Sequence, residues 1–309
     1  MSTMTRKQLR EMNSGTQKSG MITKTSGWGL VADVVIWILL LGVAFCCIIP
    51  LWHVLMASIS DGKELLSHEG VLFTPAGNPT LEGYRYLFRD ASILQGYGNT
   101  LIYVVGATFL GFILNVLGGY ALSHQSKLRS AMTLFVMFTM MFNGGLIPTY
   151  IVIKSLGMVG TRWALLIPGC TMALFVLMMS NAFQSVPQAT IEAAELDGAG
   201  HFRTMIQIAL PQTGNILVVT ILNSVILQWN SWFNASIYVT NARELWPLQL
   251  WIRQIVADNE NILRSSNPDY NRYLVQYGVI IAATLPVLVA FPFFQKRLEA
   301  GAMAGAVKG

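Results

Sequence analysis

Long apolar runs separated by short polar stretches constrain this chain more than any other feature. From Trp28 onward, six runs are each long enough to cross about 30 Å of hydrocarbon, which takes roughly 20 helical residues. Because lipid offers no hydrogen-bond partners to the backbone, such runs must form helices. A barrel would need apolar and polar positions alternating over about ten residues, and that pattern is missing. The predicted spans are residues 28–57, 100–122, 131–153, 163–183, 214–239 and 277–294.

Composition excludes the other broad classes of protein. The 309 residues are 53% hydrophobic and 11% charged, whereas soluble domains are about 25% charged. So few charged side chains could not cover the surface of a soluble domain, and a low charge with high apolar content argues against disorder. We therefore expect an all-α integral membrane protein, with a flexible polar tail over residues 1–27 and one transmembrane domain over residues 28–309.

The distribution of basic residues indicates the orientation of the chain. With six spans both termini lie on the same side, and if that side is the cytoplasm it holds 11 of the 20 Lys and Arg residues, against 9 outside. Two outer loops are long, over residues 58–99 and 240–276, and basic residues far from a span count for little. We therefore expect cytoplasmic termini, with a cytoplasmic loop over residues 184–213 and a C-terminal tail over residues 295–309.

Ionisable residues are almost absent from the predicted spans. Only Asp33 and His53 fall within one, each near an end of the first. Ion-coupled carriers usually hold ionisable groups near mid-membrane, so that class loses support. The chain has no G-x-x-x-x-G-K-[ST] motif, so any ATP that drives it must be hydrolysed by another chain. No catalytic or metal-ligand constellation is found, so we expect neither an enzyme nor a cofactor on this chain, and no nucleic-acid partner.

The most specific signal lies between the fourth and fifth spans. Its residues alone predict a short helix with early acids, a glycine bend, and a second, amphipathic helix over His201–Leu210. Its fixed positions resemble the signature of ABC importer permeases, EAA-x3-G-x9-I-x-L-P, at every spacing. Seven such residues match by chance on the order of 10⁻⁸ per start position. They are Glu192, Ala193, Ala194, Gly198, Ile208, Leu210 and Pro211.

The resemblance implies a type I ABC importer permease fold in the bacterial cytoplasmic membrane. In that family the EAA helix docks in a groove of a cytoplasmic ATPase. Glu192 would be the ionic partner of a basic group there, Ala193 and Ala194 would allow close approach, and Gly198 would allow the turn. The partners implied are a second, homologous permease, two ATPase subunits that hold ATP and Mg, and an extracytoplasmic solute-binding protein.

Three further stretches resemble carbohydrate-uptake permeases, specifically the maltose-type second permease subunit and the related LplC/YtcP-like group. They are residues 228–235, 244–253 and 301–309. This resemblance implies a carbohydrate substrate, in particular an oligosaccharide. Two alternatives stay open: an ABC permease for a non-sugar solute such as a peptide or polyamine, and an ATP-independent carrier.

Candidate residues of the substrate pathway lie in the third and fifth spans. Tryptophan faces can stack on sugar rings and amides can bind hydroxyl groups, which favours Gln228, Trp229, Trp232 and Asn234. The alternative is that these tryptophans belong to an interfacial belt. Asn143, followed by Gly144 and Gly145, either faces the pathway or permits a helix bend.

The outer loops are expected to receive the solute-binding protein. The second of them contains a predicted amphipathic helix, Leu248–Val256. By analogy with the family, residues 259–273 could reach into the sugar site of that protein.

Overall fold

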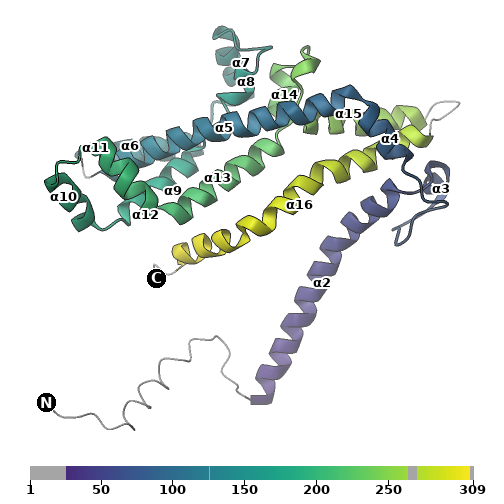
Figure 1. Cartoon of the computed structure of the whole chain (residues 1–309), viewed down its shortest axis with the longest axis horizontal. Helices are drawn as coiled ribbons and strands as arrows, with labels where there is room; N and C mark the ends of the chain where they lie inside the picture. The colour runs from purple at the N-terminus through teal and green to yellow at the C-terminus, as the bar shows by residue number, and fades with distance from the viewer. Residues whose placement is uncertain (1–25, 125, 264–269, 307–309) are drawn as a thin grey trace. The chain divides into compact units, whose positions relative to one another are not determined.

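The computed structural model describes residues 26–124, 126–263 and 270–306, and this part of the chain is helical without a strand (Figure 1). The chain divides into two units at His53–Val54, within the first helix. The elements are α2 (Ser26–Ser58), α3 (Gly62–Ser67), α4 (Glu82–Arg89), α5 (Ala91–Ser123), α6 (Arg129–Met141), α7 (Leu146–Ser155), α8 (Trp163–Leu166), α9 (Ala173–Gln184), α10 (Gln188–Leu196), α11 (His201–Arg203), the π-helix η1 (Thr204–Ala209), α12 (Leu210–Gln212), α13 (Gly214–Trp229), α14 (Phe233–Tyr238), the 3₁₀-helix η2 (Arg243–Leu245), α15 (Leu248–Leu263) and α16 (Tyr270–Ala306).

Helix α5 organises the second unit. It packs against α9, α13 and α15, and α13 lies between α5 and α16 (Figure 1). Small residues permit the close approach, as is usual between membrane helices. A methyl group at Gly111 would overlap the carbonyl oxygen of Cys170, and one at Gly119 would lie 2.6 Å from Cβ of Met179. Glycine is therefore required on this face of α5.

The helical fold class is confirmed, while the count of six spans remains a prediction. Three helices are individually long and apolar enough to cross a membrane: Val31–Ser58, Ala91–Ser123 and Tyr273–Pro292. Two bent pairs meet the same test when each is taken together, namely Arg129–Met141 with Leu146–Ser155, and His201–Gln212 with Gly214–Trp229. Length and composition thus support three to five spans.

The third predicted span, residues 131–153, is bent at residues 142–145, which is one of the two alternatives that the sequence left open for Asn143. Helix α6 ends at Met141, α7 begins at Leu146, and their axes are bent by 110°. Gly145 adopts a positive φ of 84°, which side chains other than glycine rarely tolerate. The side chain of Asn143 stabilises the turn, because its Oδ1 accepts a hydrogen bond from the backbone N of Gly145 at 2.7 Å.

The fourth and fifth predicted spans, residues 163–183 and 214–239, are also interrupted. The fourth contains α8 and α9 with a non-helical segment over residues 167–172, where Pro168 and Gly169 weaken the helix. The fifth ends at Trp229, and α14 starts only at Phe233. Consequently Trp229 and Trp232 do not lie on one continuous helix.

The ends of the remaining predicted segments also differ. Helix α16 continues past residue 294 to Ala306, so most of the predicted C-terminal tail is helical. Helix α15 extends the predicted amphipathic helix to Leu263. Residues 1–25 of the predicted N-terminal tail, residues 264–269 of the outer loop and residues 307–309 lie outside the described residues.

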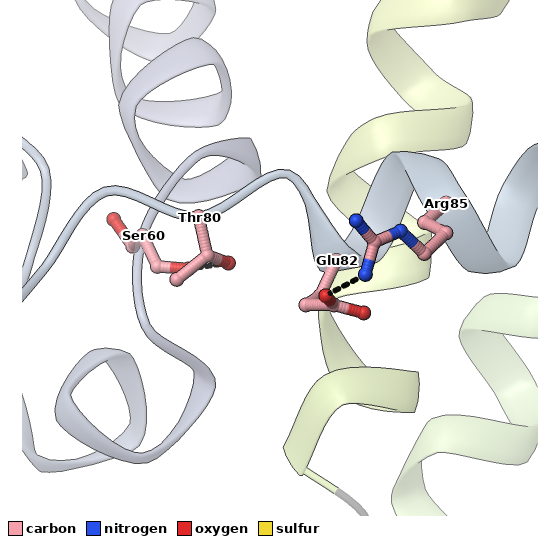
Figure 2. A network of polar contacts seen from close by, with 4 residues as sticks. All are labelled: Ser60, Thr80, Glu82 and Arg85. Atoms are coloured by element: carbon pink, nitrogen blue, oxygen red, sulfur yellow. Dashed lines mark hydrogen bonds and ion pairs between the residues drawn. The ribbon is translucent and has the colours of Figure 1, made fainter.

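The loop between α2 and α5, residues 59–90, is ordered, and we call it the cap. Asp61 caps α3 by accepting from the backbone N of Lys63 at 2.9 Å, and Oγ of Ser60 accepts from the backbone N of Ala76 at 2.9 Å. Figure 2 shows Thr80, whose hydroxyl donates to the carbonyl of Ser60. Helix α4 then packs along α16. The predicted outer loop, residues 58–99, is therefore folded and contains α3, α4 and the first turns of α5.

Candidate functional site

The EAA segment folds as a helix, a glycine turn and a second helical stretch. Helix α10 covers Gln188–Leu196, and Gly198 follows with a positive φ of 82°. The turn closes through hydrogen bonds from the backbone N of Gly198 to the carbonyl of Glu195 and from Ala199 N to Ala194 O. This is the helix–glycine–helix order that the sequence predicts.

The second stretch is not the regular α-helix predicted over His201–Leu210. Its centre, η1, is a π-helix, and the backbone N of Leu210 donates to the carbonyl of Met205, five residues back. Pro211 follows directly and has no N–H to continue an α-helical ladder. The wider turn buries Met205 and Ala209 but leaves Phe202 and Ile206 exposed. The predicted apolar face is therefore only half buried.

Buried residues of η1 anchor this loop to the helical bundle. Met205 and Ala209 share a core cluster with Val116 of α5 and with Met179 and Phe183 of α9. Leu210 packs against the same cluster, and Ile208 is half-buried. Pro211 remains exposed. The second half of the loop is therefore fixed to α5, which carries the second span, and to α9, which carries part of the fourth.

Helix α10 has the opposite character, because none of its residues is buried. Leu196, at its C-terminal end, is 90% exposed. Glu192 and Ala193 are exposed and Ala194 is half-buried. Within the described part of the chain Glu192 makes no ion pair. An exposed leucine beside an unpaired carboxylate is a surface suited to another protein.

A polar cavity of about 570 Å³ lies at the base of α10. Glu192 and Glu195 line it together with His124, Arg129 and Tyr120. The rings of His124 and His201 meet edge to face at 5.4 Å, and Nδ1 of His201 lies 3.9 Å from Oε1 of Glu195. The two glutamates of the EAA segment thus border a polar recess shared with the ends of α5 and α9.

The broken fourth span is the second candidate region. Non-helical backbone inside a membrane protein needs partners from neighbouring helices. Nε2 of Gln228 donates to the carbonyl of Gly169 at 2.5 Å, and the hydroxyl of Thr171 donates to Oδ1 of Asn115. Side chains of α13 and α5 therefore supply hydrogen-bond partners to the non-helical segment between α8 and α9.

A cavity of about 220 Å³ lies against this break. Two of the predicted pathway residues, Gln228 and Asn234, line it. Its other polar contributors were not predicted: the hydroxyls of Thr171, Ser224 and Ser231. The dipeptide Pro168-Gly169 could have indicated this cavity from the sequence, because a helix that breaks there exposes polar backbone groups. The remaining lining residues are Pro168, Gly169, Cys170, Met172, Phe175 and Leu227.

The other predicted pathway residues lie elsewhere. Trp229 is buried, and its Nε1 donates to the carbonyl of Ala283 in α16 at 3.2 Å. Trp232 lies beneath the guanidinium of Arg253, with 3.8 Å from Cζ to the ring centroid. Asn143 stays in the exposed turn between α6 and α7. The structure thus brings Gln228 and Asn234 together and separates the other three from them.

Comparison with known proteins gives the family. Residues 107–303 match the family described as "Binding-protein-dependent transport system inner membrane component". The chain belongs to this family. It is 32% identical over 284 residues to the polygalacturonan/rhamnogalacturonan transport system permease protein YtcP of Bacillus subtilis, which covers 90% of this chain and 98% of the relative. It is 31% identical over 288 residues to protein LplC of the same organism, covering 91% and 96%.

A solved structure resembles this permease along most of its length. A chain of a bacterial ABC transporter involved in the import of the acidic polysaccharide alginate matches with a TM-score of 0.80 and 26% identity, covering 89% of this permease and 99% of that chain. The family confirms the predictions of an ABC importer permease, a multi-pass protein of the plasma membrane, rather than an enzyme. The described residues contain no group of three or more His, Cys, Asp or Glu that could hold a metal.

Proposed function

We propose that this permease is one of two transmembrane subunits of an ATP-driven importer for a carbohydrate, specifically an oligosaccharide. The sugar assignment rests on similar permeases that are named for carbohydrates. YtcP is named for polygalacturonan and rhamnogalacturonan. A further relative, 25% identical over 267 residues, is the diacetylchitobiose uptake system permease protein NgcG of Streptomyces coelicolor. The cavity beside Gln228 and Asn234 supports this class, because amides and hydroxyls bind sugar hydroxyl groups.

The coupling surface of the proposed importer is helix α10. A cytoplasmic ATPase, which holds ATP and Mg, would receive Leu196 in an apolar groove and pair a basic side chain with Glu192. Ala193 and Ala194 would let the two backbones approach, and Gly198 would set the turn. Met205, Ala209 and Leu210 of the second stretch pack on the cluster shared by α5 and α9. A displacement of α10 would therefore be transmitted to the spans.

The proposed topology has six spans with both termini in the cytoplasm. A second, homologous permease would complete the pathway, and an extracytoplasmic solute-binding protein would deliver the sugar to the side opposite α10. Closure of the two ATPase subunits on ATP would open the pathway outward, and hydrolysis would reset it. Gln228 and Asn234 are the residues proposed to contact sugar on this chain. The buried hydrogen bond of Trp229 supports a packing role for that side chain.

The test is reconstitution of the complete transporter in proteoliposomes. We expect uptake of an oligosaccharide that requires ATP, the ATPase and the binding protein. Leu196→Ser and Glu192→Gln should each lower uptake about tenfold or more by weakening assembly with the ATPase, because hot-spot side chains contribute about 2 kcal/mol or more. Leu81→Ser is the matched control, since Leu81 is 66% exposed in the cap that precedes α4.

Two results would contradict the proposal. Uptake that continues without ATP would exclude an ATP-driven importer. ATP-driven uptake of peptides or polyamines, with no saccharide accepted, would exclude the carbohydrate assignment while leaving the coupling role of α10 in place.

A further inference from the structure

Three arginines are each held over an aromatic ring in the second unit. The guanidinium of Arg253 in α15 lies 3.8 Å from the ring centroid of Trp232. Arg243 lies 5.3 Å from that of Trp246, and Arg162, directly before α8, lies 5.9 Å from that of Tyr103. We call these three arginines and their three rings the arginine–aromatic cluster.

The arginines of this cluster lack anionic partners within the described residues. The side-chain ion pairs found there join Arg85 to Glu82 and His201 to Glu195. Arg85 therefore provides a contrast, because its Nη1 lies 2.6 Å from Oε1 of Glu82 (Figure 2). Nη1 of Arg162 is buried without any hydrogen-bond partner. A buried donor left unpaired costs free energy until an acceptor reaches it.

The three rings belong to one packed region. Tyr103 and Trp246 are members of the same buried core cluster, and Trp232 packs against it. We call residues 184–213, which contain α10, the coupling loop. Along α5, Tyr103 is 21 residues from His124, which lines the cavity beside this loop, and 21 residues correspond to about 30 Å of helix. The arginine–aromatic cluster is therefore remote from the surface proposed for the ATPase.

The core cluster that holds Tyr103 and Trp246 also contains Cys170, which lines the cavity at the broken fourth span. Ser231 and Asn234 line that cavity, and they stand on either side of Trp232 in the sequence. Arg162 precedes α8, which leads directly into the break over residues 167–172. Two chain segments thus connect the cluster with the polar cavity.

The chemistry of this arrangement suits a carboxylate attached to a sugar ring. The planar guanidinium presents a fork of N–H donors that matches a carboxylate in two-point geometry. Stacking on a ring fixes the guanidinium plane while its donor edge stays available, and indole faces pack well against the apolar faces of sugars. A neutral sugar would supply no charge to pair with these three cations.

We infer that the arginine–aromatic cluster binds the carboxylates of an acidic oligosaccharide, one that contains uronate units, as it enters the pathway. The inference rests on the proposed function and names the substrate class within it. Arg253 is the principal contact, since it is exposed, lies closest to its ring, and has no ion pair within the described residues. Arg162 supplies a second donor, and Arg243, next in sequence to the exposed Glu244, contributes less.

The experiment uses the complete transporter with its binding protein in proteoliposomes. The probes are trigalacturonate and maltotriose, two trisaccharides that differ in charge. Trigalacturonate should stimulate ATPase activity and be taken up, with a KM that rises as salt screens the charges. Arg253→Gln and Arg162→Gln should each raise this KM about tenfold with little change in kcat, because each removes a charge-assisted hydrogen-bond donor.

Two further variants keep the test decisive. Arg85→Gln is the matched control, because Arg85 is already paired with Glu82, and its KM should stay at the parent value. Arg253→Lys retains the charge without the fork, and an intermediate KM is expected even if the glutamine variant assembles poorly. The binding protein is identical in all samples, so differences belong to this chain.

The outcomes separate this inference from the proposed function. Uptake of neutral saccharides without trigalacturonate would overturn the acidic-sugar inference and leave the importer assignment intact. An unchanged KM for trigalacturonate in both glutamine variants would overturn the role of the cluster. Failure of every saccharide to be taken up with ATP would instead overturn the proposed function.

Discussion

The coupling loop and the broken fourth span both interrupt helical structure with glycine, yet they are built in opposite ways. Helix α10, which precedes the turn at Gly198, has no buried residue, and its Leu196 is 90% exposed. The break over residues 167–172 is held by Gln228 and Asn115 from neighbouring helices. The first region is an exposed surface, which we propose docks a partner protein, while the second is shaped by contacts within its own fold.

The contrast shows that two helix interruptions, each containing glycine, can serve different purposes. A change in the coupling loop should alter communication with the ATPase and leave folding intact. A change at the break should first alter folding, because helix packing and the hydrogen bonds of the non-helical backbone depend on it. Substitutions of the same kind in the two regions therefore test whether this division holds.

The largest effect is expected from Gly111→Ala. The added methyl group would overlap the backbone carbonyl oxygen of Cys170, and backbone cannot move aside as a flexible side chain can. The destabilisation should exceed the roughly 1–3 kcal/mol of ordinary overpacking. Recovery of monodisperse protein in detergent and the midpoint of thermal unfolding would measure it. Gly98→Ala in the same helix is the control, since nothing lies within 4 Å of the new methyl group. Equal midpoints for the two variants would refute the close contact.

The same substitution in the coupling loop should separate folding from transport. Gly198→Ala forces alanine into a left-handed conformation at φ 82°, which costs about 1–2 kcal/mol. We expect normal insertion and unfolding but about tenfold lower ATP-driven uptake, because α10 would be reoriented. Gly200→Ala, at φ −70° with open space around it, should transport normally. A Gly198→Ala protein with full uptake would remove the basis for treating this turn as functional.

An intermediate effect is expected from Gln228→Leu. The change leaves the carbonyl of Gly169 without its donor, at a cost of about 1–2 kcal/mol. The unfolding midpoint should fall by several degrees, as a loss of this size usually requires. Asn223→Leu is the matched control, because the Asn223 amide donates to the carbonyl of Val219 in its own helix. Comparable losses in both variants would mean that the break does not depend on α13.

The smallest effect is expected from Asn143→Ala. The side chain of Asn143 caps the turn before α7 and is exposed, so its loss should cost about 0.5–1 kcal/mol. The KM for sugar uptake should stay within about twofold, as expected for an exposed turn residue. Asn234→Ala, which removes an amide from the 220 Å³ cavity, should raise the KM severalfold. The opposite ranking would assign Asn143 to the pathway and not to the bend.

Local patterns in the sequence predicted the coupling loop well. The EAA stretch depends on residues close in the chain, namely a helix-forming run and Gly198, so its helix–turn–helix order could be predicted from the sequence. The π-helical turn before Pro211 was missed, because it depends on how Met205 and Ala209 pack against α5 and α9. Hydropathy likewise predicted the helices of the spans. The residues Asn143, Gly144 and Gly145 offered a bend in the third span, but the breaks in the fourth and fifth were not predicted.

Tertiary contacts explain why the broken fourth span could not be predicted in detail. The sequence contains Pro168-Gly169, yet only the contact with Gly111 and the amides of Gln228 and Asn115 show how the break is stabilised. The separation of Trp229 from Trp232 has a similar origin. Trp229 finds its partner in Ala283, which is 54 residues away in the sequence.

The length of α5 has a mechanical consequence. The helix runs for 33 residues, or about 50 Å, from the cap beside α4 to His124 at the coupling loop. A rigid rod of that length acts as a lever. A tilt of about 10° at one end displaces the other by about 9 Å, roughly the diameter of a helix with its side chains. A modest push on the loop anchored by Met205 could thus become a movement large enough to admit a sugar ring at the far end.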